Sequence, residues 1–135
     1  MSNRKHNQEG RIAAVLCCSC ALWVLGCGGP ALPDPPPTYS VGGTVYDAQG
    51  RPLKCGIIQF MSEANPQLTM SAMISDDGSY ELKTIFGNRN LEGAIEGNCK
   101  VLVTPSFGSG MPKTTVLSKL YRIEPHASKI DVKVE

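Results

Sequence analysis

The apolar residues of this chain follow two different patterns along the sequence. Residues 12–25 (IAAVLCCSCALWVL) form a run of fourteen residues without a charged side chain. From residue 41 onward, apolar residues instead occur in short runs, which are separated by turns that contain glycine or proline. This second part has no helical period over a useful length, whereas several of its runs alternate apolar and polar residues. The pattern therefore predicts an all-β domain over residues 41–135.

The alternating runs predict the individual strands of this domain. We expect Ile58 and Phe60 to face the interior, and residues 76–78 (DDG) predict a hairpin turn, because Asp-Gly accepts the positive φ of such turns. A seventh strand is expected at residues 114–117 or 85–86. Spacing and alternation favour a small β-sandwich. The six strands predicted first cover residues 41–46, 55–61, 68–75, 80–84, 99–103 and 130–135.

The N-terminal apolar run has the features of a secretory signal. Residues 1–11 are polar and contain three basic residues against one acidic residue. As a helix, the apolar run would reach only about 21 Å at about 1.5 Å per residue, short of a hydrocarbon core of about 30 Å. A basic start followed by a short apolar run is typical of a cleaved signal segment, which we predict over residues 1–26. The alternative is a buried core helix, but the run has no polar face.

Residues 24–29 (VLGCGG) resemble the lipobox of bacterial lipoproteins. In that family a diacylglyceryl group is attached to the cysteine and the chain is cleaved just before it, which implies lipidation of Cys27. Cysteine is needed there, because a thiolate is the nucleophile that accepts the lipid. The alternative is ordinary signal cleavage with an unmodified Cys27. The resemblance implies export and a lipid anchor in the cell membrane or outer membrane, and the glycine at position 28 favours the outer membrane.

A proline-rich segment separates Cys27 from the predicted domain. Residues 28–40 (GGPALPDPPPTYS) contain five of the ten prolines of the chain, and consecutive prolines favour an extended polyproline II conformation. We therefore predict that residues 27–40 are a lipidated cysteine and a tether, which would hold the domain some tens of ångströms from a membrane surface. The alternative is a proline-rich ligand for another protein domain.

Charge limits the partners of the predicted mature chain. From Cys27 onward there are ten Lys or Arg residues and eleven Asp or Glu residues, a formal net charge near −1. The charges are mixed along the chain, so neither a basic face nor an acidic tail is predicted. A nearly neutral surface gives no electrostatic reason to expect a nucleic-acid partner.

Three segments of the domain also resemble carboxypeptidase regulatory-like domains. Residues 41–53 (VGGTVYDAQGRPL) correspond to the opening strand and turn of that family, and residues 77–82 (DGSYEL) correspond to its hairpin. Residues 97–103 (GNCKVLV) correspond to a later strand, with Cys99 in place of the usual tyrosine. The resemblance implies a transthyretin-like, seven-stranded Greek-key β-sandwich. These are turn and core motifs, so they bear on the fold and hardly on function.

Cys55 and Cys99 are the only cysteines that follow Cys27. Exported compartments favour disulfides, and a bridge that closes this loop of about 45 residues would contribute roughly 3–4 kcal/mol. We therefore consider a Cys55–Cys99 disulfide, although the alternation places Cys55 out of phase with the inward-facing residues of its strand. A bulge at Gly56 would correct the phase. The alternative is two separate thiols, one of them buried.

No residue pattern indicates catalysis. His126 is the only histidine of the predicted mature chain and is expected at the surface, and a zinc site needs about four close ligands. We therefore predict no enzyme, cofactor or metal, but a non-enzymatic, membrane-anchored lipoprotein that serves as a structural or binding module of the cell envelope. The alternative is a surface domain that binds a carbohydrate or protein ligand. Exposed rings for that purpose would come from Tyr39, Tyr46, Phe107 and Tyr121.

Overall fold

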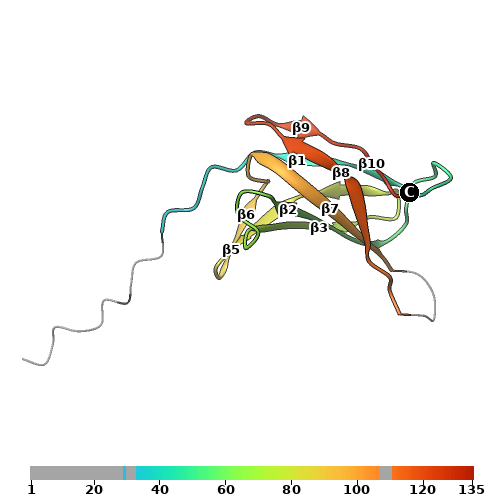
Figure 1. Cartoon of the computed structure of the whole chain (residues 1–135), viewed down its shortest axis with the longest axis horizontal. Helices are drawn as coiled ribbons and strands as arrows, with labels where there is room; N and C mark the ends of the chain where they lie inside the picture. Colours follow the sequence, from blue (N-terminus) through green and yellow to red (C-terminus); the bar gives the residue numbers. More distant parts are fainter. Residues whose placement is uncertain (1–28, 30–32, 107–110) are drawn as a thin grey trace, which may run out of the picture. The chain divides into compact units, whose positions relative to one another are not determined.

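The domain is built from two β-sheets. The computed structural model describes residue 29 and residues 33–106 and 111–135, and none of these residues lies in a helix. The described strands form one sheet of six strands and one of four, within the compact unit Pro35–Glu135 (Figure 1). This confirms the all-β class predicted from the alternating runs. The predicted signal segment, residues 1–26, and Cys27 lie outside the described residues.

The larger sheet contains the long strands of the domain. Its strand order is β6-β5-β3-β2-β7-β8, and every neighbouring pair is antiparallel. Alternate residues of its central strands are buried, as expected for a sheet with one face toward water. The strands are β2 (Gly56–Ser62), β3 (Thr69–Ile74), β5 (Lys83–Phe86), β6 (Arg89–Glu92), β7 (Gly97–Pro105) and β8 (Thr115–Ile123).

The smaller sheet is organised around β1 (Val41–Tyr46). This strand pairs antiparallel with β4 (Ser79–Glu81), and parallel with β9 (Ser128–Lys129) and β10 (Val132–Lys133). The first and last strands of the domain therefore lie side by side. Glycine at position 43 permits this close approach, because a Cβ atom there would lie 1.9 Å from a backbone oxygen of the segment between β9 and β10.

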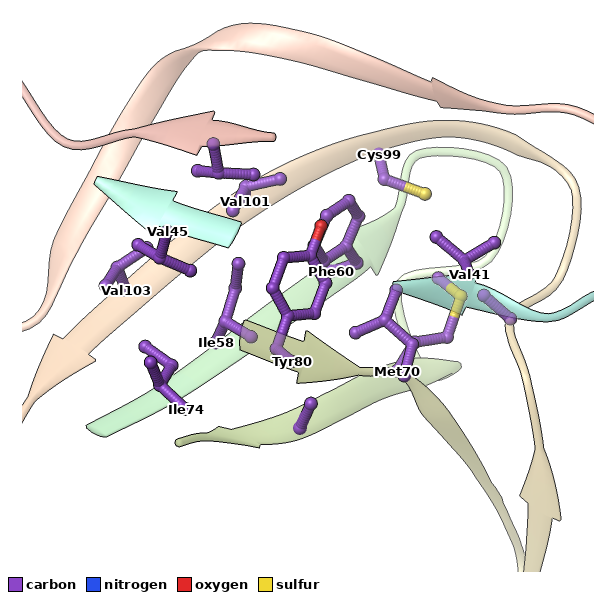
Figure 2. Packing of buried hydrophobic residues seen from close by; sticks show 14 of the residues in the cluster. Val41, Val45, Ile58, Phe60, Met70, Ile74, Tyr80, Cys99, Val101 and Val103 are labelled. Carbon is purple, nitrogen blue, oxygen red and sulfur yellow. The ribbon is translucent and has the colours of Figure 1, made fainter. Parts of the chain in front are cut away.

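The hydrophobic core lies between the two sheets. Val41 and Val45 of β1 face Ile58 and Phe60 of β2, and all four side chains are fully buried (Figure 2). The rings of Phe60 and Tyr80 join the sheets, with their centroids 6.2 Å apart. Burying an apolar side chain of this size contributes about 1.5–3 kcal/mol. Among the described residues, the buried members of this core lie between residues 41 and 132, within the compact unit Pro35–Glu135.

The most regular parts of the predicted pattern are confirmed. The strands expected over residues 41–46, 55–61, 68–75 and 99–103 correspond to β1, β2, β3 and β7, with ends shifted by one or two residues. Ile58 and Phe60 are buried as predicted. Gly78 lies in a turn with a φ of 85°, as expected, but this turn joins β3 of the larger sheet to β4 of the smaller one and is therefore not a hairpin. Alternation and turn signals were therefore sufficient for these elements.

The strand predicted over residues 80–84 is in fact divided between the two sheets. β4 ends at Glu81 in the smaller sheet, and β5 begins at Lys83 in the larger one. Between them, the fully buried Leu82 donates its N–H to the carbonyl oxygen of Val41 at 2.8 Å. The inward alternation continues through this crossing, which is why the sequence pattern suggested a single strand.

The described part of the chain contains ten strands, whereas seven were predicted. Both positions considered for the seventh strand are strands: residues 85–86 belong to β5 and residues 115–117 to β8. β6 was missed because its sequence, RNLE, has no apolar alternation. Of the last predicted strand, residues 130–135, only β10 (Val132–Lys133) is a strand, and the two-residue β9 (Ser128–Lys129) precedes the predicted range.

The described residues that precede β1 have no strand structure until Tyr39. This residue forms an isolated antiparallel bridge with Ala94, in which each N–H donates to the other's carbonyl oxygen at 2.8 Å. Ala94 is fully buried, so the bridge attaches the entering chain to the edge of the core. Ordered contacts of the domain therefore begin slightly before the predicted boundary at residue 41.

Candidate functional site

Large apolar side chains are exposed on the solvent side of the larger sheet. Apart from Met111, every large apolar residue that is exposed in the described part of the chain belongs to this sheet. These residues alternate with buried ones and therefore point away from the core. Met73, for example, is 81% exposed between the buried Ala72 and Ile74. The exposed residues of the sheet are Ile57, Met73, Ile85, Val116 and Leu120.

Strand pairing joins these side chains into one surface. Ile57 of β2 lies directly opposite Met73 of β3, and Val116 of β8 lies opposite Leu102 of β7. Side chains that are directly opposite on one face have Cβ atoms about 4.5–5.5 Å apart and contact each other. We call the solvent side of β3, β2, β7 and β8 the outer face. Contiguous exposed apolar surface of this kind is typical of an interaction site.

The outer face is also positively charged. Lys100 and Arg122 lie on this side, and the four strands contain no acidic residue, whereas Lys119 of β8 lies on the other side, beside Tyr121. Neither Lys100 nor Arg122 takes part in the ion pairs found among the described residues. Acidic residues follow only after the strands end, as Glu63 after β2 and Glu124 after β8. Strand pairing brings together Lys100 and Arg122, which are distant in the sequence.

β8 forms the edge of this surface. It pairs only with β7, and its register shifts between Lys100 and Leu102 of that strand, which produces an irregularity in β8. Lys119 of β8 extends over the ring of Tyr121, with Nζ 5.1 Å from the ring centroid. Bulges and lysines at a sheet edge oppose pairing with a further strand. The apolar and cationic side chains, rather than the backbone edge, are therefore the groups that β8 offers to a partner.

A groove adjoins the outer face where β3, β4 and β5 meet. It is open to solvent and has a volume of about 830 Å³. Ile57, Met73 and Ile85 provide apolar surface, and the lining residue Lys83 forms an ion pair with Glu92, with Nζ 2.8 Å from Oε1. The hydrogen bond from Lys83 to Glu92 raises the pKa of this lysine. Polar lining groups come from Ser40, Ser71, Ser75, Ser79, Glu81 and Asn90.

The disulfide considered between Cys55 and Cys99 is not formed, and both cysteines are free. Cys99 pairs with Ser62 at one end of β2, whereas Cys55 precedes Gly56 at the other end. At about 3.3 Å per residue, the two cysteines are about 20 Å apart, and a disulfide requires Cα atoms within about 7 Å. β2 pairs with β7 without a register shift, so the bulge expected at Gly56 is absent as well.

The two thiols have different surroundings, but neither favours the thiolate. Burial raises the pKa of Cys99 to about 11. Cys55 is exposed, and its Sγ donates a hydrogen bond to Oδ1 of Asp76 at 3.0 Å, which raises the pKa of this thiol. Because the thiolate is the nucleophilic form, neither cysteine is activated for covalent chemistry in this arrangement.

The remaining residues considered for chemistry do not assemble into a site. His126 is at the surface, and its Nε2 lies 3.2 Å from Oε2 of Glu124. Its side chain is 60% exposed, as predicted for a surface histidine. Among the described residues, no three histidine, cysteine, aspartate or glutamate side chains form a group that could hold a metal ion.

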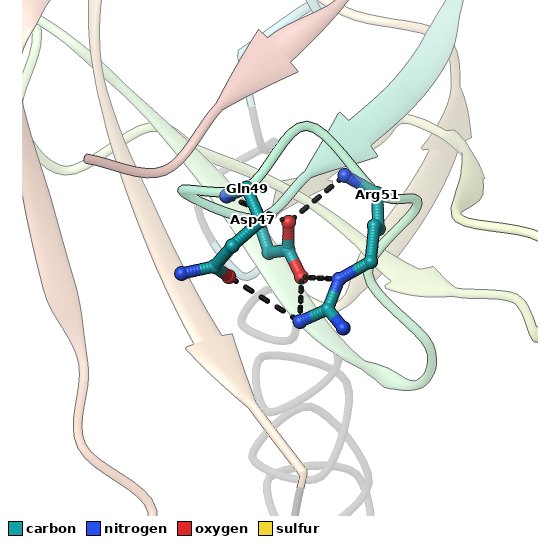
Figure 3. A network of polar contacts seen from close by, with 3 residues as sticks. All are labelled: Asp47, Gln49 and Arg51. Carbon is teal, nitrogen blue, oxygen red and sulfur yellow. Dashed lines mark hydrogen bonds and ion pairs between the residues drawn. The ribbon is translucent and has the colours of Figure 1, made fainter.

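A polar network stabilises the turn after β1 (Figure 3). Oδ1 of Asp47 accepts hydrogen bonds from the backbone N–H groups of Gln49 and Arg51, each at 2.9 Å. Oδ2 of Asp47 accepts from Nε of Arg51, also at 2.9 Å, and the guanidinium forms an ion pair with the same carboxylate. These contacts lower the pKa of Asp47, with the backbone N–H of Arg51 making the largest contribution. We assign the network a structural role in the turn.

No family model, no curated protein and no solved structure matches this chain. Within the described residues, no helix has the length and apolar character needed to cross a membrane. The outer face and the groove are therefore the features on which a functional interpretation of the described domain rests.

The sequence contained a partial signal for the outer face. Ile57 and Ile58 are adjacent apolar residues in a strand, so one of them must face solvent. Met73 likewise precedes the inward-facing Ile74. The absence of acidic residues from β2, β3, β7 and β8 was a second signal, which becomes visible only when those four strands are known to be neighbours.

Proposed function

We propose that this chain is a non-enzymatic, lipid-anchored module of the cell envelope. The observation that carries the proposal is the VLGC sequence ending at Cys27, which directly follows a short uncharged apolar run. The arrangement of the remaining chain supports an anchor at that position, because eleven residues lie between Cys27 and the bridge formed by Tyr39, and the core of the described residues lies beyond it. The domain would act by contact with other envelope components.

We also propose the transthyretin-like Greek-key arrangement for the domain. Without the β5–β6 hairpin, and with β9 and β10 counted as one interrupted strand along β1, the domain has seven strands. Four of these are in order β3-β2-β7-β8, and three are in order β10-β1-β4. The chain changes sheet between β1 and β2, between β3 and β4, between β4 and β5, and between β8 and β9. These features support the arrangement that the sequence resemblance implies.

Mass spectrometry of the full chain extracted from bacterial membranes tests the anchor. We expect a mass that lacks residues 1–26 and includes a lipid on Cys27. Cys27→Ser is expected to abolish both the lipid and membrane retention, because serine lacks the thiolate that accepts the lipid. Cys55→Ser serves as the matched control and should retain both. An unprocessed chain without lipid, or a lipid that persists in Cys27→Ser, would contradict the proposal.

The groove provides a second candidate function, the binding of a carbohydrate or protein ligand. Its serines and Asn90 offer hydrogen bonds, but Tyr80 is its one aromatic lining residue and is only 5% exposed. Sugar-binding sites commonly use an exposed ring for stacking, so we expect no binding of residues 35–135 to an array of envelope glycans. Glycan binding that is lost in Asn90→Ala, but retained in the exposed control Asn65→Ala, would favour the carbohydrate candidate instead.

A further inference from the structure

We propose that the outer face rests on an anionic phospholipid surface, so that the lipid anchor is supported by a second, reversible membrane contact. This inference rests on the proposed lipid anchor and specifies what the anchored domain touches. It combines the apolar side chains of β2, β3 and β8 with the cations of β7 and β8. The outer face would contact the headgroups and the upper part of the acyl chains of a membrane that contains acidic lipids.

The apolar component consists of side chains that cost free energy when they remain in water. Met73 and Val116 are 81% and 61% exposed, and Ile57 and Leu120 are each about half exposed. They come from strands across the breadth of the face, from β3 through β2 to the β8 edge. Apolar side chains on one side of an element can enter the boundary between headgroups and acyl chains when that element lies parallel to the membrane.

The cationic component makes an anionic surface the fitting partner. Lys100 and Arg122 lie on neighbouring strands, since Lys100 pairs with Leu120 and Arg122 follows two residues later. They provide two positive charges, and the four strands provide no carboxylate that would be repelled by phosphates. Basic residues close to an acidic leaflet are attracted to it, and the attraction adds to apolar insertion.

A second copy of this chain fits the outer face less well. Two outer faces in contact would bury Lys100 and Arg122 of both copies in one interface, because neither face contains an acid to pair with them. Like charges in a desolvated contact are strongly unfavourable. Addition of a strand at β8 is opposed by the register irregularity and by Lys119 at this edge.

The tether allows the domain to reach the membrane. Eleven residues lie between Cys27 and Tyr39, so the tether would span about 37 Å in a polyproline II conformation, at about 3.1 Å for each of the twelve steps. An anchored domain therefore stays near the surface at a high effective concentration. A contact too weak to hold a free protein would then be occupied for much of the time.

Vesicle binding by residues 35–135 tests the outer face without depending on Cys27. The probe is phosphatidylglycerol vesicles, compared with phosphatidylcholine vesicles in a sedimentation assay. We expect at least tenfold stronger binding to phosphatidylglycerol, with the difference reduced at high salt because exposed charges are screened. Equal binding to both lipids, or no binding to phosphatidylglycerol, would overturn the proposal.

Two charge-matched double variants locate the contact. Lys100→Glu with Arg122→Glu changes the outer face, whereas Lys54→Glu with Lys133→Glu makes the same change in net charge elsewhere. We expect at least a tenfold loss of phosphatidylglycerol binding for the first pair and less than a twofold loss for the second. Circular dichroism establishes that both remain folded. Equal losses would show that net charge, rather than the outer face, drives binding, and would overturn the proposal.

A tryptophan probe reports whether the apolar side chains enter the membrane. Trp23 is the only tryptophan of the chain and lies outside residues 35–135, so a new tryptophan is the only one present. We expect brominated phospholipids to quench Val116→Trp, but not Lys133→Trp on the smaller sheet. Equal quenching of the two would contradict docking through the outer face.

The outcomes separate this inference from the proposed anchor and from a protein partner. An unlipidated Cys27 with intact vesicle binding would overturn the anchor alone, whereas lipidation without vesicle binding would overturn the membrane contact alone. Polyglutamate in solution represents an acidic protein. Binding of residues 35–135 to polyglutamate, together with no binding to phosphatidylglycerol vesicles, would assign the face to an acidic protein and overturn the membrane proposal.

Discussion

Asp47 shows how a single side chain can organise a turn that connects the two sheets. Both of its carboxylate oxygens accept hydrogen bonds, from two backbone N–H groups and from the guanidinium of Arg51. The turn leads from β1 in the smaller sheet toward β2 in the larger one. Such local hydrogen bonding of an aspartate to the backbone of the following residues is the usual reason for aspartate in turns.

The lowered pKa of Asp47 leads to a prediction about pH. A carboxyl group whose pKa is lower in the folded state stabilises the fold above its unfolded pKa, near 3.8, and loses that contribution as the pH falls through the folded pKa. We expect Asp47→Asn to lower the melting temperature by a few degrees at pH 7, because its amide cannot replace the charged carboxylate opposite Arg51.

The measurement is thermal unfolding of residues 35–135 followed by circular dichroism from pH 7 to below pH 3. The difference between the wild type and Asp47→Asn should shrink as the pH falls below about 3.8. The comparison at each pH removes the effects of the other carboxylates, which both proteins share. A difference that stays constant over this range would show that the charge of Asp47 does not contribute to stability.

At the scale of elements, the strands with the most regular apolar pattern were predicted most accurately. β2 and β3 have inward-facing apolar residues at alternate positions and were predicted nearly to their ends, whereas β6 has only Leu91 as an apolar residue and was missed. In β8 the register irregularity interrupts the alternation, so Leu117 and Ile123 are buried while Lys119 between them is exposed. A period-two pattern cannot indicate such an interruption, because the interruption is defined by the partner strand.

The outer face could not be predicted from the sequence, for a related reason. Lys100 and Arg122 belong to strands separated by a long connection, and only the pairing of β7 with β8 makes them neighbours. The same pairing data excluded the disulfide, because Cys55 and Cys99 lie at opposite ends of β2. Local propensity identified the strands, but the surface depends on strand order, which long-range pairing determines.

At the scale of the whole molecule, the two ends of the domain are held together by β1. β9 and β10 pair with it in parallel, and Val132 of β10 is fully buried in the core. Tyr80 strengthens this closure, since its hydroxyl donates a hydrogen bond to the carbonyl oxygen of Ile130 at 2.6 Å. Burial raises the pKa of Tyr80, so the hydroxyl keeps the proton that it donates.

Because β10 pairs with β1 and contributes Val132 to the core, we expect a conservative change in this last strand to destabilise the entire domain. Val132→Ala removes two buried carbon atoms from the core and should lower the free energy of unfolding by about 2–3 kcal/mol. Val116→Ala makes the same chemical change at a position that is 61% exposed, and should alter stability by no more than about 0.5 kcal/mol. Urea unfolding of residues 35–135 measures both changes in stability. A shift of the midpoint urea concentration, with an unchanged dependence of the unfolding free energy on urea, reports the change.

This pair of variants also separates folding from surface contact. If Val132→Ala is the more destabilising, β10 belongs to the cooperative unit and the domain unfolds as a whole, as expected for a single core of this size. If Val116→Ala is neutral, a loss of vesicle binding caused by changes at position 116 reflects the outer face itself, because the fold is preserved. Equal destabilisation by the two variants would contradict the burial of Val132, and with it the closure of the smaller sheet by the end of the chain.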